Sequence, residues 1–245
     1  LGWRVLQLDH RAHGQSPAGE PPHTIEACAQ DVLETLAAAG VHVEGPGADE
    51  LVVCGHSFGG KVALAVLQAL LDRGAPPPRR TWLFDSVPGR PARLSAEVSR
   101  REQSVDFVLG VVERAAARGL YADRAALVEA LEKEHGLSTP LAGWVAQSVR
   151  YAPEGVALSY DVETVRALYD AYQGTDFWHL LEGGRADVGV VVAGRNRHAW
   201  GDENMRRLDG VGHGRLHRAM LKNAGHNVHV DDLPGLLDTV RPTFV

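Results

Sequence analysis

The sequence predicts an α/β fold in which a mostly parallel sheet carries helices on both faces and a helical block is inserted between its strands. Short continuous apolar runs alternate with segments of helical periodicity, which is typical of parallel strands buried on both sides. The strand pattern stops in the middle of the chain and then resumes. Hydrophobic residues make up 44% of the 245 residues, enough for one sizeable core, so the length fits one domain with an insertion.

The first third of the chain predicts three strands and two helices. The first strand ends at Asp9, where a loop rich in turn-forming residues begins. Thr24 is placed to cap the first helix, and Gly40 is placed to end it. The expected strands lie at residues 3–8, 51–54 and 81–84, and the expected helices at 25–39 and 62–71.

The middle of the chain shows helical patterns and no run typical of a buried strand. We expect it to form a helical lid over the carboxyl edge of the sheet, where open α/β folds bind ligands. The expected organisation is a core at residues 1–92 and 183–245 with a lid at 93–182. Lid helices are expected at 105–117, 124–134, 141–149 and 162–172; in the last part of the chain, strands are expected at 188–192 and 216–221 and helices near 203–208 and 233–240.

The composition argues against several classes of protein. Lys and Arg number 25 against 31 Asp and Glu, a net charge of −6, whereas a nucleic-acid surface needs a positive field. No apolar stretch reaches the roughly 18 residues of a membrane span. Two cysteines, Cys28 and Cys54, cannot form a multi-bridge scaffold, and we expect Cys54 to be a small buried apolar residue. With no signal peptide at the start of the sequence, an intracellular or organellar location is favoured over secretion.

A motif for a nucleophilic serine stands between a predicted strand and a predicted helix. The segment Gly55 to Gly59 fits the pattern G-x-S-x-G, with Ser57 at its centre. A serine aimed out of a sheet edge sits on a sharp, strained turn, and flanking glycines keep the neighbouring chain from colliding with it. The backbone N–H of Phe58, at the start of the helix, is then a candidate oxyanion donor. The alternative is a glycine-rich connection with an ordinary serine.

The candidate base is His226, which follows the last predicted strand and precedes the closing helix. A loop in that place carries a histidine over the sheet edge towards Ser57, and the chain order of serine, acid and histidine is kept. A serine hydroxyl is a poor nucleophile unless a neutral imidazole takes its proton. His226 and His229 together lack the third ligand of a metal site, so no metal is expected.

These motifs together resemble the α/β-hydrolase superfamily. The resemblance is carried by Asp-His-Arg-Ala-His-Gly-Gln-Ser at 9–16, by the turn around Ser57 with Lys61, and by Gly225 with His226. The turn, with residues 83–89, is similar to the small serine esterases of the α/β-hydrolase-domain-containing group, and the lid is similar to plant and algal members. The resemblance implies the α/β-hydrolase fold with up to eight strands. It also implies hydrolysis of small-molecule esters or thioesters through an acyl-enzyme, without metal or organic cofactor.

Two departures from the family pattern stand near the start of the chain. Ala12 occupies a position where the family usually carries glycine, and we expect it to be tolerated unless the backbone needs a positive φ. The chain also begins at the segment that matches the family's fourth strand, so we expect an N-terminally truncated sequence. In the family, a His-Gly loop that precedes this strand supplies the second oxyanion donor. Losing one donor costs about 3 kcal/mol, or a hundredfold in rate.

The acid that would orient His226 does not stand in the position that many family members use, because that position holds Arg197. A guanidinium cannot orient an imidazole as a carboxylate does. Asp85, at the carboxyl end of the preceding strand, is the favoured acid over Asp202 and Glu203, and Asn196 is expected to lend the histidine a polar contact. Lys61 is expected to be structural. Aromatic residues at 144, 160, 169, 172, 177 and 178 are candidates for an acyl pocket or for packing within the lid.

The prediction is therefore a serine hydrolase with Ser57 as nucleophile, His226 as base and Asp85 as the acid, with Asp202 as the alternative acid. A C–C bond hydrolase or an acyltransferase with the same three residues stays open. So does a non-catalytic binding protein that keeps the fold, which the missing strands and Arg197 favour. The sequence does not specify the natural substrate or the oligomeric state.

Overall fold

The computed structural model describes residues 2–43, 47, 50–101 and 104–245. The chain divides into two compact units, which we call the core unit and the inserted unit. The core unit comprises the chain up to Leu8, Pro22–Arg93 and Asp170–Val245. The inserted unit comprises Asp9–Pro21 and Leu94–Tyr169.

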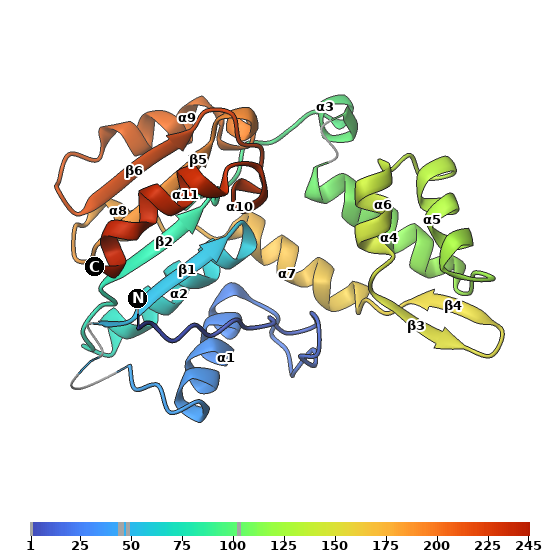
Figure 1. The fold of residues 1–245 in the computed structure, drawn as a ribbon, viewed down its shortest axis with the longest axis horizontal. Coiled ribbons are helices and arrows are strands. Elements are labelled where there is room, and N and C mark those ends of the chain that lie inside the picture. The colour runs from blue at the N-terminus through green and yellow to red at the C-terminus, as the bar shows by residue number, and fades with distance from the viewer. Residues whose placement is uncertain (1, 44–46, 48–49, 102–103) are drawn as a thin grey trace. The chain divides into compact units, whose positions relative to one another are not determined.

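A parallel sheet of four described strands forms the centre of the core unit, in the order β1-β2-β5-β6 (Figure 1). The register pairs His56 with Phe84 and Phe84 with Val191, so the carboxyl ends of β1, β2 and β5 lie at the same edge. Residues that follow these strands are therefore brought together. The α/β fold with a parallel sheet is confirmed. The strands are β1 (Val52–His56), β2 (Arg80–Phe84), β5 (Val188–Ala193) and β6 (Leu216–Leu221).

Helices pack against this sheet and close the core. Thr24 caps α1 as expected, since its Oγ1 accepts a hydrogen bond from the N–H of Ala27 at 3.1 Å. Trp82 of β2 is buried in a cluster with residues of α10 and α11, and α11 lies in front of the sheet in Figure 1 with α2 behind it. The core-unit helices are α1 (Ile25–Ala38), α2 (Phe58–Asp72), α8 (Trp178–Glu182), α9 (Arg197–Gly210), α10 (Val228–Asp231) and α11 (Leu233–Val240), with 3₁₀ turns at Gly194–Asn196 and Arg241–Phe244.

The inserted unit has its own hydrophobic core, which includes the fully buried Val111, Leu127 and Val145. Besides helices it contains an antiparallel hairpin, so the expectation of helices alone is wrong there, and the helix expected at 141–149 ends at Val145. Gly155, the first residue of the second hairpin strand, allows a close approach to Tyr121: its φ is +145°, and a Cβ there would lie 2.0 Å from the carbonyl oxygen of Tyr121. The elements are α3 (Ala96–Arg101), α4 (Val105–Arg118), α5 (Arg124–Lys133), α6 (Thr139–Val145), β3 (Val149–Ala152), β4 (Gly155–Leu158) and the start of α7 (Val162–Gly174).

The strand expected at residues 3–8 is not formed. This segment pairs with none of the described strands, and a strand pattern becomes a strand only when a neighbour satisfies its backbone groups. Trp3 instead donates from its indole N–H to the carbonyl of Phe244 at 3.0 Å. β1 is consequently an edge strand among the described residues. Its Cys54 is exposed, which corrects the expectation that this residue is buried.

Ala12 adopts a positive φ, the one condition under which we expected alanine not to be tolerated at this position. Its φ is +61°, in the left-handed region where a Cβ crowds the following carbonyl at a cost of roughly 1–2 kcal/mol. The surrounding turn holds it there through a 3.1 Å hydrogen bond from the N–H of Ala12 to the carbonyl of Pro17. Alanine is therefore accommodated with strain where glycine would have none.

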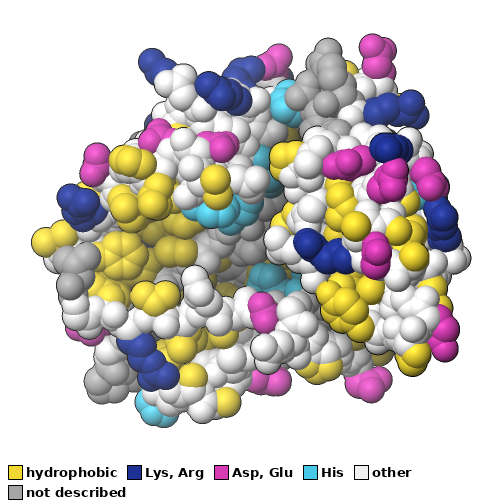
Figure 2. Space-filling model, turned by 45° about the vertical axis from the view of Figure 1, so that its right-hand side comes forward, with side chains coloured by type: hydrophobic (Ala, Val, Ile, Leu, Met, Phe, Trp, Pro, Cys, Tyr) yellow, Lys and Arg dark blue, Asp and Glu magenta, His cyan; other side chains and the backbone are white. Residues whose placement is uncertain are grey.

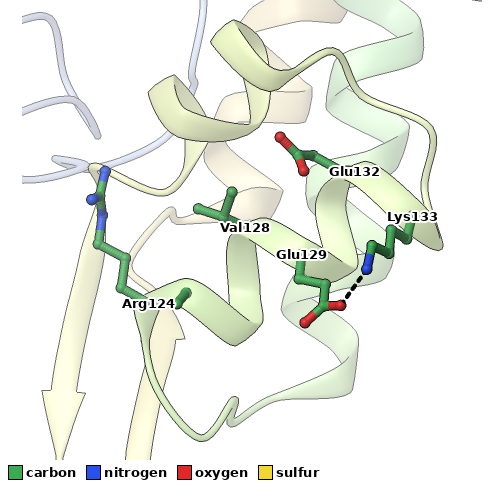
Figure 3. Close-up of a pocket in the computed structure, with 6 residues that line it drawn as sticks. Arg124, Val128, Glu129, Glu132 and Lys133 are labelled. Carbon is green, nitrogen blue, oxygen red and sulfur yellow. Dashed lines mark hydrogen bonds and ion pairs between the residues drawn. The ribbon is translucent and has the colours of Figure 1, made fainter.

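Other features of the surface suggest no chemistry. A shallow hollow along α5 is lined by Glu132 and by the exposed ion pair of Glu129 and Lys133, at 2.6 Å (Figure 3). Basic and acidic side chains are interspersed on the face that Figure 2 shows. Within the described residues, no helix is long and apolar enough to span a bilayer, and no cluster of three or more His, Cys, Asp or Glu side chains is arranged to hold a metal.

Candidate active site

Ser57 sits on a strained turn between β1 and α2. Its φ is +52°, which is rare for a residue with a side chain, and its N–H donates to the carbonyl of Phe84 at 3.0 Å. The chain folds back so tightly that a Cβ on Gly55 would lie 2.0 Å from the carbonyl oxygen of Gly59. A Cβ on Gly60 would lie 2.4 Å from the Cβ of Ser86. Glycine at these positions is therefore a steric requirement of the turn.

His226 lies on the loop between β6 and α10 and meets Ser57 directly. Its Nε2 is 2.9 Å from Ser57 Oγ, across 169 residues of sequence. The loop is fixed on both sides of the ring: the N–H of Gly225 donates to Asp231 Oδ2 at 2.7 Å, and the N–H of Val228 donates to the carbonyl of His226 at 3.0 Å. The imidazole is thus held at hydrogen-bond distance from the hydroxyl.

Asp85 follows β2 and completes the arrangement. Its side chain is buried, and its Oδ2 lies 2.8 Å from His226 Nδ1. Asn196 Nδ2 donates to the same oxygen at 2.7 Å, while the N–H of Ala193 and the indole N–H of Trp200 donate to Oδ1, each at 3.0 Å. Burial by itself would raise the pKa of Asp85, but these hydrogen bonds hold that pKa below its usual value. The carboxyl group is therefore ionised at neutral pH.

The alternative acid lies elsewhere. Asp202 is on an exposed face of α9, where its Oδ1 accepts from Arg197 at 3.1 Å and its side chain is 82% exposed. Arg197, in the slot that many family members give to the acid, is thus engaged away from the imidazole. Asn196 contacts His226 as expected, since its Nδ2 lies 3.2 Å from His226 Nδ1, and it also donates to Asp85, which was not predicted. The structure brings Ser57, His226 and Asp85 together and leaves Asp202 apart.

Comparison with known proteins now gives the family. A family model described as "Alpha/beta hydrolase family" matches residues 1–236. The chain belongs to the alpha/beta hydrolase family. No curated protein matches this alpha/beta hydrolase.

Solved structures share the fold of this alpha/beta hydrolase at low identity. A marine microorganism esterase has a TM-score of 0.70 at 14% identity, over 96% of this chain and 82% of its own. The thioesterase domain from the curacin biosynthetic pathway has a TM-score of 0.62 at 17% identity, over 96% and 79%. The enol-lactonase from Burkholderia xenovorans LB400 has a TM-score of 0.60 at 19% identity, over 96% and 78%. At these identities the likeness shows the fold alone.

Two residues around the site of this alpha/beta hydrolase escaped the sequence analysis. His56, in the turn motif, donates from Nε2–H to the carbonyl of His226 at 2.8 Å, and the two rings are 4.6 Å apart. Burial, followed by the nearby His226, lowers the pKa of His56 to about 4. Trp200 was detectable in principle, because it is a large apolar residue in an otherwise polar segment.

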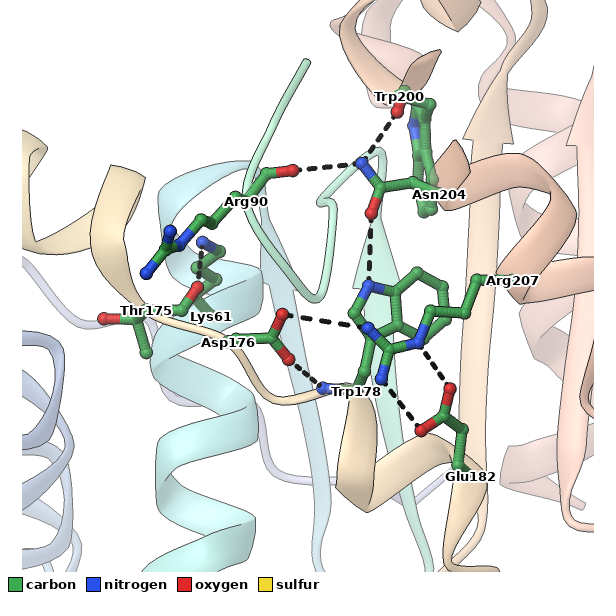
Figure 4. A network of polar contacts seen from close by, with 9 residues as sticks. All are labelled: Lys61, Arg90, Thr175, Asp176, Trp178, Glu182, Trp200, Asn204 and Arg207. Atoms are coloured by element: carbon green, nitrogen blue, oxygen red, sulfur yellow. Dashed lines mark hydrogen bonds and ion pairs between the residues drawn. The ribbon is translucent and has the colours of Figure 1, made fainter. Parts of the chain in front are cut away.

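A polar network holds Trp200 in place, and Trp200 in turn donates to Asp85 (Figure 4). The carbonyl of Trp200 accepts from Asn204 Nδ2 at 2.8 Å, and Asn204 Oδ1 accepts from the indole N–H of Trp178 at 3.1 Å. Gly201, with φ +68°, breaks α9 directly after Trp200. A Cβ at that glycine would lie 2.9 Å from the Cβ of Ala92, so the kink also depends on glycine.

The half-buried, neutral His56 gives this alpha/beta hydrolase a specific acid sensitivity. Its folded pKa of about 4 lies below the unfolded value of 6.5, so between these values only the unfolded chain takes up the proton. The contribution is complete above pH 6.5 and is lost as the pH falls, by roughly 2–3 kcal/mol at pH 4.5. Urea unfolding at pH 7.5 and 4.5 should therefore show a steeper loss of stability for the natural chain than for His56→Gln. Equal losses in the two proteins would contradict the prediction.

Proposed function

We propose that this alpha/beta hydrolase is a serine hydrolase that cleaves carboxylic esters or thioesters through an acyl-enzyme intermediate. The observation that carries the proposal is the continuous path from Ser57 Oγ to His226 Nε2, at 2.9 Å, and from His226 Nδ1 to Asp85 Oδ2, at 2.8 Å. A hydroxyl, an imidazole and a carboxylate in this order form the arrangement that makes serine nucleophilic at neutral pH.

In the proposed mechanism, Ser57 Oγ attacks the acyl carbon while its proton passes to His226 Nε2. Asp85 accepts the Nδ1–H of His226, which keeps Nε2 free to take the proton and stabilises the imidazolium that forms. His226 then gives the proton to the leaving alkoxide or thiolate, and the acyl group stays on Ser57. Water, deprotonated by His226, attacks the acyl carbon; the bond to Ser57 Oγ then breaks, and His226 returns the proton to that oxygen as the acid leaves.

The proposed oxyanion donor is the backbone N–H of Phe58. Phe58 directly follows Ser57 and is the first residue of α2, whose N-terminal end carries a partial positive charge. A donor in this place is aimed at the oxygen on which negative charge develops in the transition state. The acyl class in the proposal is consistent with neighbours named as an esterase, a thioesterase domain and an enol-lactonase.

Labelling with a fluorophosphonate tests the proposal without knowledge of the natural substrate. Such a probe loses fluoride when an activated serine attacks its phosphorus, so we expect one label, on the peptide that contains Ser57. Ser57→Ala should take up none, while Ser95→Ala, which removes an exposed serine, should be labelled as the natural chain is. A folded natural chain that takes up no label would contradict the proposal and favour a binding protein. Turnover of β-diketones or transfer to alcohols in place of ester hydrolysis would favour the other two enzyme classes.

A further inference from the structure

Lys61 is a charged residue buried in an unusual way. It stands on α2, four residues after Ser57, and its side chain is fully buried. In the described part of the chain, no carboxylate lies within ion-pair distance of its Nζ. Burying an ammonium group without an ion pair is expensive unless several hydrogen bonds replace its water. Burial lowers the pKa of Lys61 to about 7, although Asp176 opposes this shift.

Within the described residues, Lys61 forms its hydrogen bonds with the end of one other helix. Its Nζ donates to the backbone carbonyl of Tyr172 and, at 2.8 Å, to that of Thr175. Tyr172 lies in the last turn of α7, where carbonyls have no partner within the helix and the dipole is negative. Figure 4 shows the Lys61 side chain reaching the backbone of Thr175. A lysine of the nucleophile helix thus caps the carboxyl end of α7.

The same contact holds an aromatic ring beside the nucleophile turn. Lys61 Nζ lies 4.3 Å from the centroid of the Tyr172 ring, which is a cation–π distance. The ring of Phe58 also packs near that of Tyr172, with the two centroids 6.1 Å apart. Because Phe58 and Lys61 are three residues apart, they project from the same face of α2. Lys61 therefore holds the Tyr172 ring next to Phe58, which directly follows Ser57.

The segment after Tyr172 is anchored a second time, on the side of the acid. Trp178 donates from its indole N–H to Asn204, which in turn bonds the backbone of Trp200, the donor to Asp85. The N–H of Phe177 donates to the carbonyl of Pro88 at 3.0 Å. Residues 172–178 are consequently fixed at both ends, at one end by Lys61 and at the other by the network of Figure 4.

We propose that Lys61 is a positioning residue that holds the Tyr172 ring against Phe58, so that the ring forms a fixed wall for the acyl group bound to Ser57. This inference rests on the proposed function. Loss of the wall removes contacts that only a long acyl chain makes, so it weakens binding of that chain more than it slows the chemical step. Lys61→Met keeps the length and removes the donors; Lys61→Arg keeps the donors; Tyr172→Ala removes the ring and leaves the carbonyl that Lys61 binds.

The test is steady-state kinetics on p-nitrophenyl acetate and p-nitrophenyl octanoate. For Lys61→Met and for Tyr172→Ala we expect KM for the octanoate to rise about tenfold, while kcat/KM for the acetate changes less than about threefold. The double variant of Lys61→Met and Tyr172→Ala should raise KM for the octanoate little more than either single substitution does, because the two residues act as a unit. Lys61→Arg should restore much of the octanoate KM. Equal losses on both esters, or additive losses in the double variant, would overturn the proposal.

The folded state is checked separately, so that a failure of the proposed function is recognisable. If the natural chain hydrolyses neither ester, fluorophosphonate labelling decides whether the proposed function fails, and thermal unfolding of the same four variants decides separately whether Lys61 holds Tyr172. A double variant that melts as the more damaged single variant does would support the contact, and a double variant that melts lower by the sum of the two shifts would contradict it. If Lys61→Met does not fold, Tyr172→Ala decides, because it retains Lys61 and its hydrogen bonds. An unchanged octanoate KM in Tyr172→Ala would then overturn the proposal.

Discussion

Replacement of His226 by glutamine should lower kcat for p-nitrophenyl acetate by about 10⁵–10⁶-fold, because the serine and histidine of such a site act as a unit. In the natural chain His226 Nε2 stands 2.9 Å from Ser57 Oγ, and in the proposed mechanism it takes the proton of that hydroxyl. Glutamine retains polarity and approximate size but has no basic nitrogen, so the hydroxyl keeps its proton at neutral pH. Fluorophosphonate labelling should fall in parallel with hydrolysis, since both reactions need the same activated oxygen.

His229→Gln provides the matched control for this prediction. His229 lies three residues further on and is exposed. Its ring centroid is 5.1 Å from that of His56. Removing it should change kcat by less than about threefold, as expected for a surface substitution. Comparable losses in both variants would mean that the loop and not the imidazole of His226 is responsible. Comparably small losses would remove His226 from the mechanism.

The parts of the site that lie at strand ends were open to prediction from the sequence. Ser57 and Asp85 each follow a short apolar run, and the carboxyl ends of adjacent parallel strands meet at one sheet edge. His56 and Trp200 were not predicted, although they hold His226 and Asp85. Trp200 lies 115 residues from Asp85, and only the kink at Gly201 aims its indole at the carboxylate. Such contacts depend on tertiary geometry, which periodicity does not encode.

The errors in the fold have the same origin. The pattern at residues 3–8 suits a strand, but strand formation depends on a neighbour, and none of the described strands pairs with it. The hairpin of β3 and β4 was hidden because four-residue strands are too short to show alternation. By contrast, α11 was predicted at Leu233–Val240 and β6 at Leu216–Leu221, where apolar spacing and flanking turn residues agree.

Replacement of Asp85 by asparagine should lower kcat by about 10⁴-fold, with little effect on KM. The carboxylate accepts four hydrogen bonds, two at each oxygen. An asparagine has one acceptor oxygen and a donor NH₂ group, so two of the four donors would face another donor. The imidazole of His226 would then turn or change tautomer, and its Nε2 would carry the hydrogen that it must instead accept from Ser57.

Asp202→Asn is the comparison that decides between the two candidate acids. Asp202 is 82% exposed and pairs only with Arg197 among its described ion-pair partners, so its loss removes a surface pair worth less than about 1 kcal/mol. We expect kcat within about twofold of the natural value for Asp202→Asn. A loss in Asp202→Asn that matches the loss in Asp85→Asn would contradict the assignment, and small losses in both would show that His226 needs neither carboxylate. We expect the large loss of kcat to be confined to Asp85→Asn. Asp85 is buried with four fixed donors around its carboxylate, so water cannot take the place of that group.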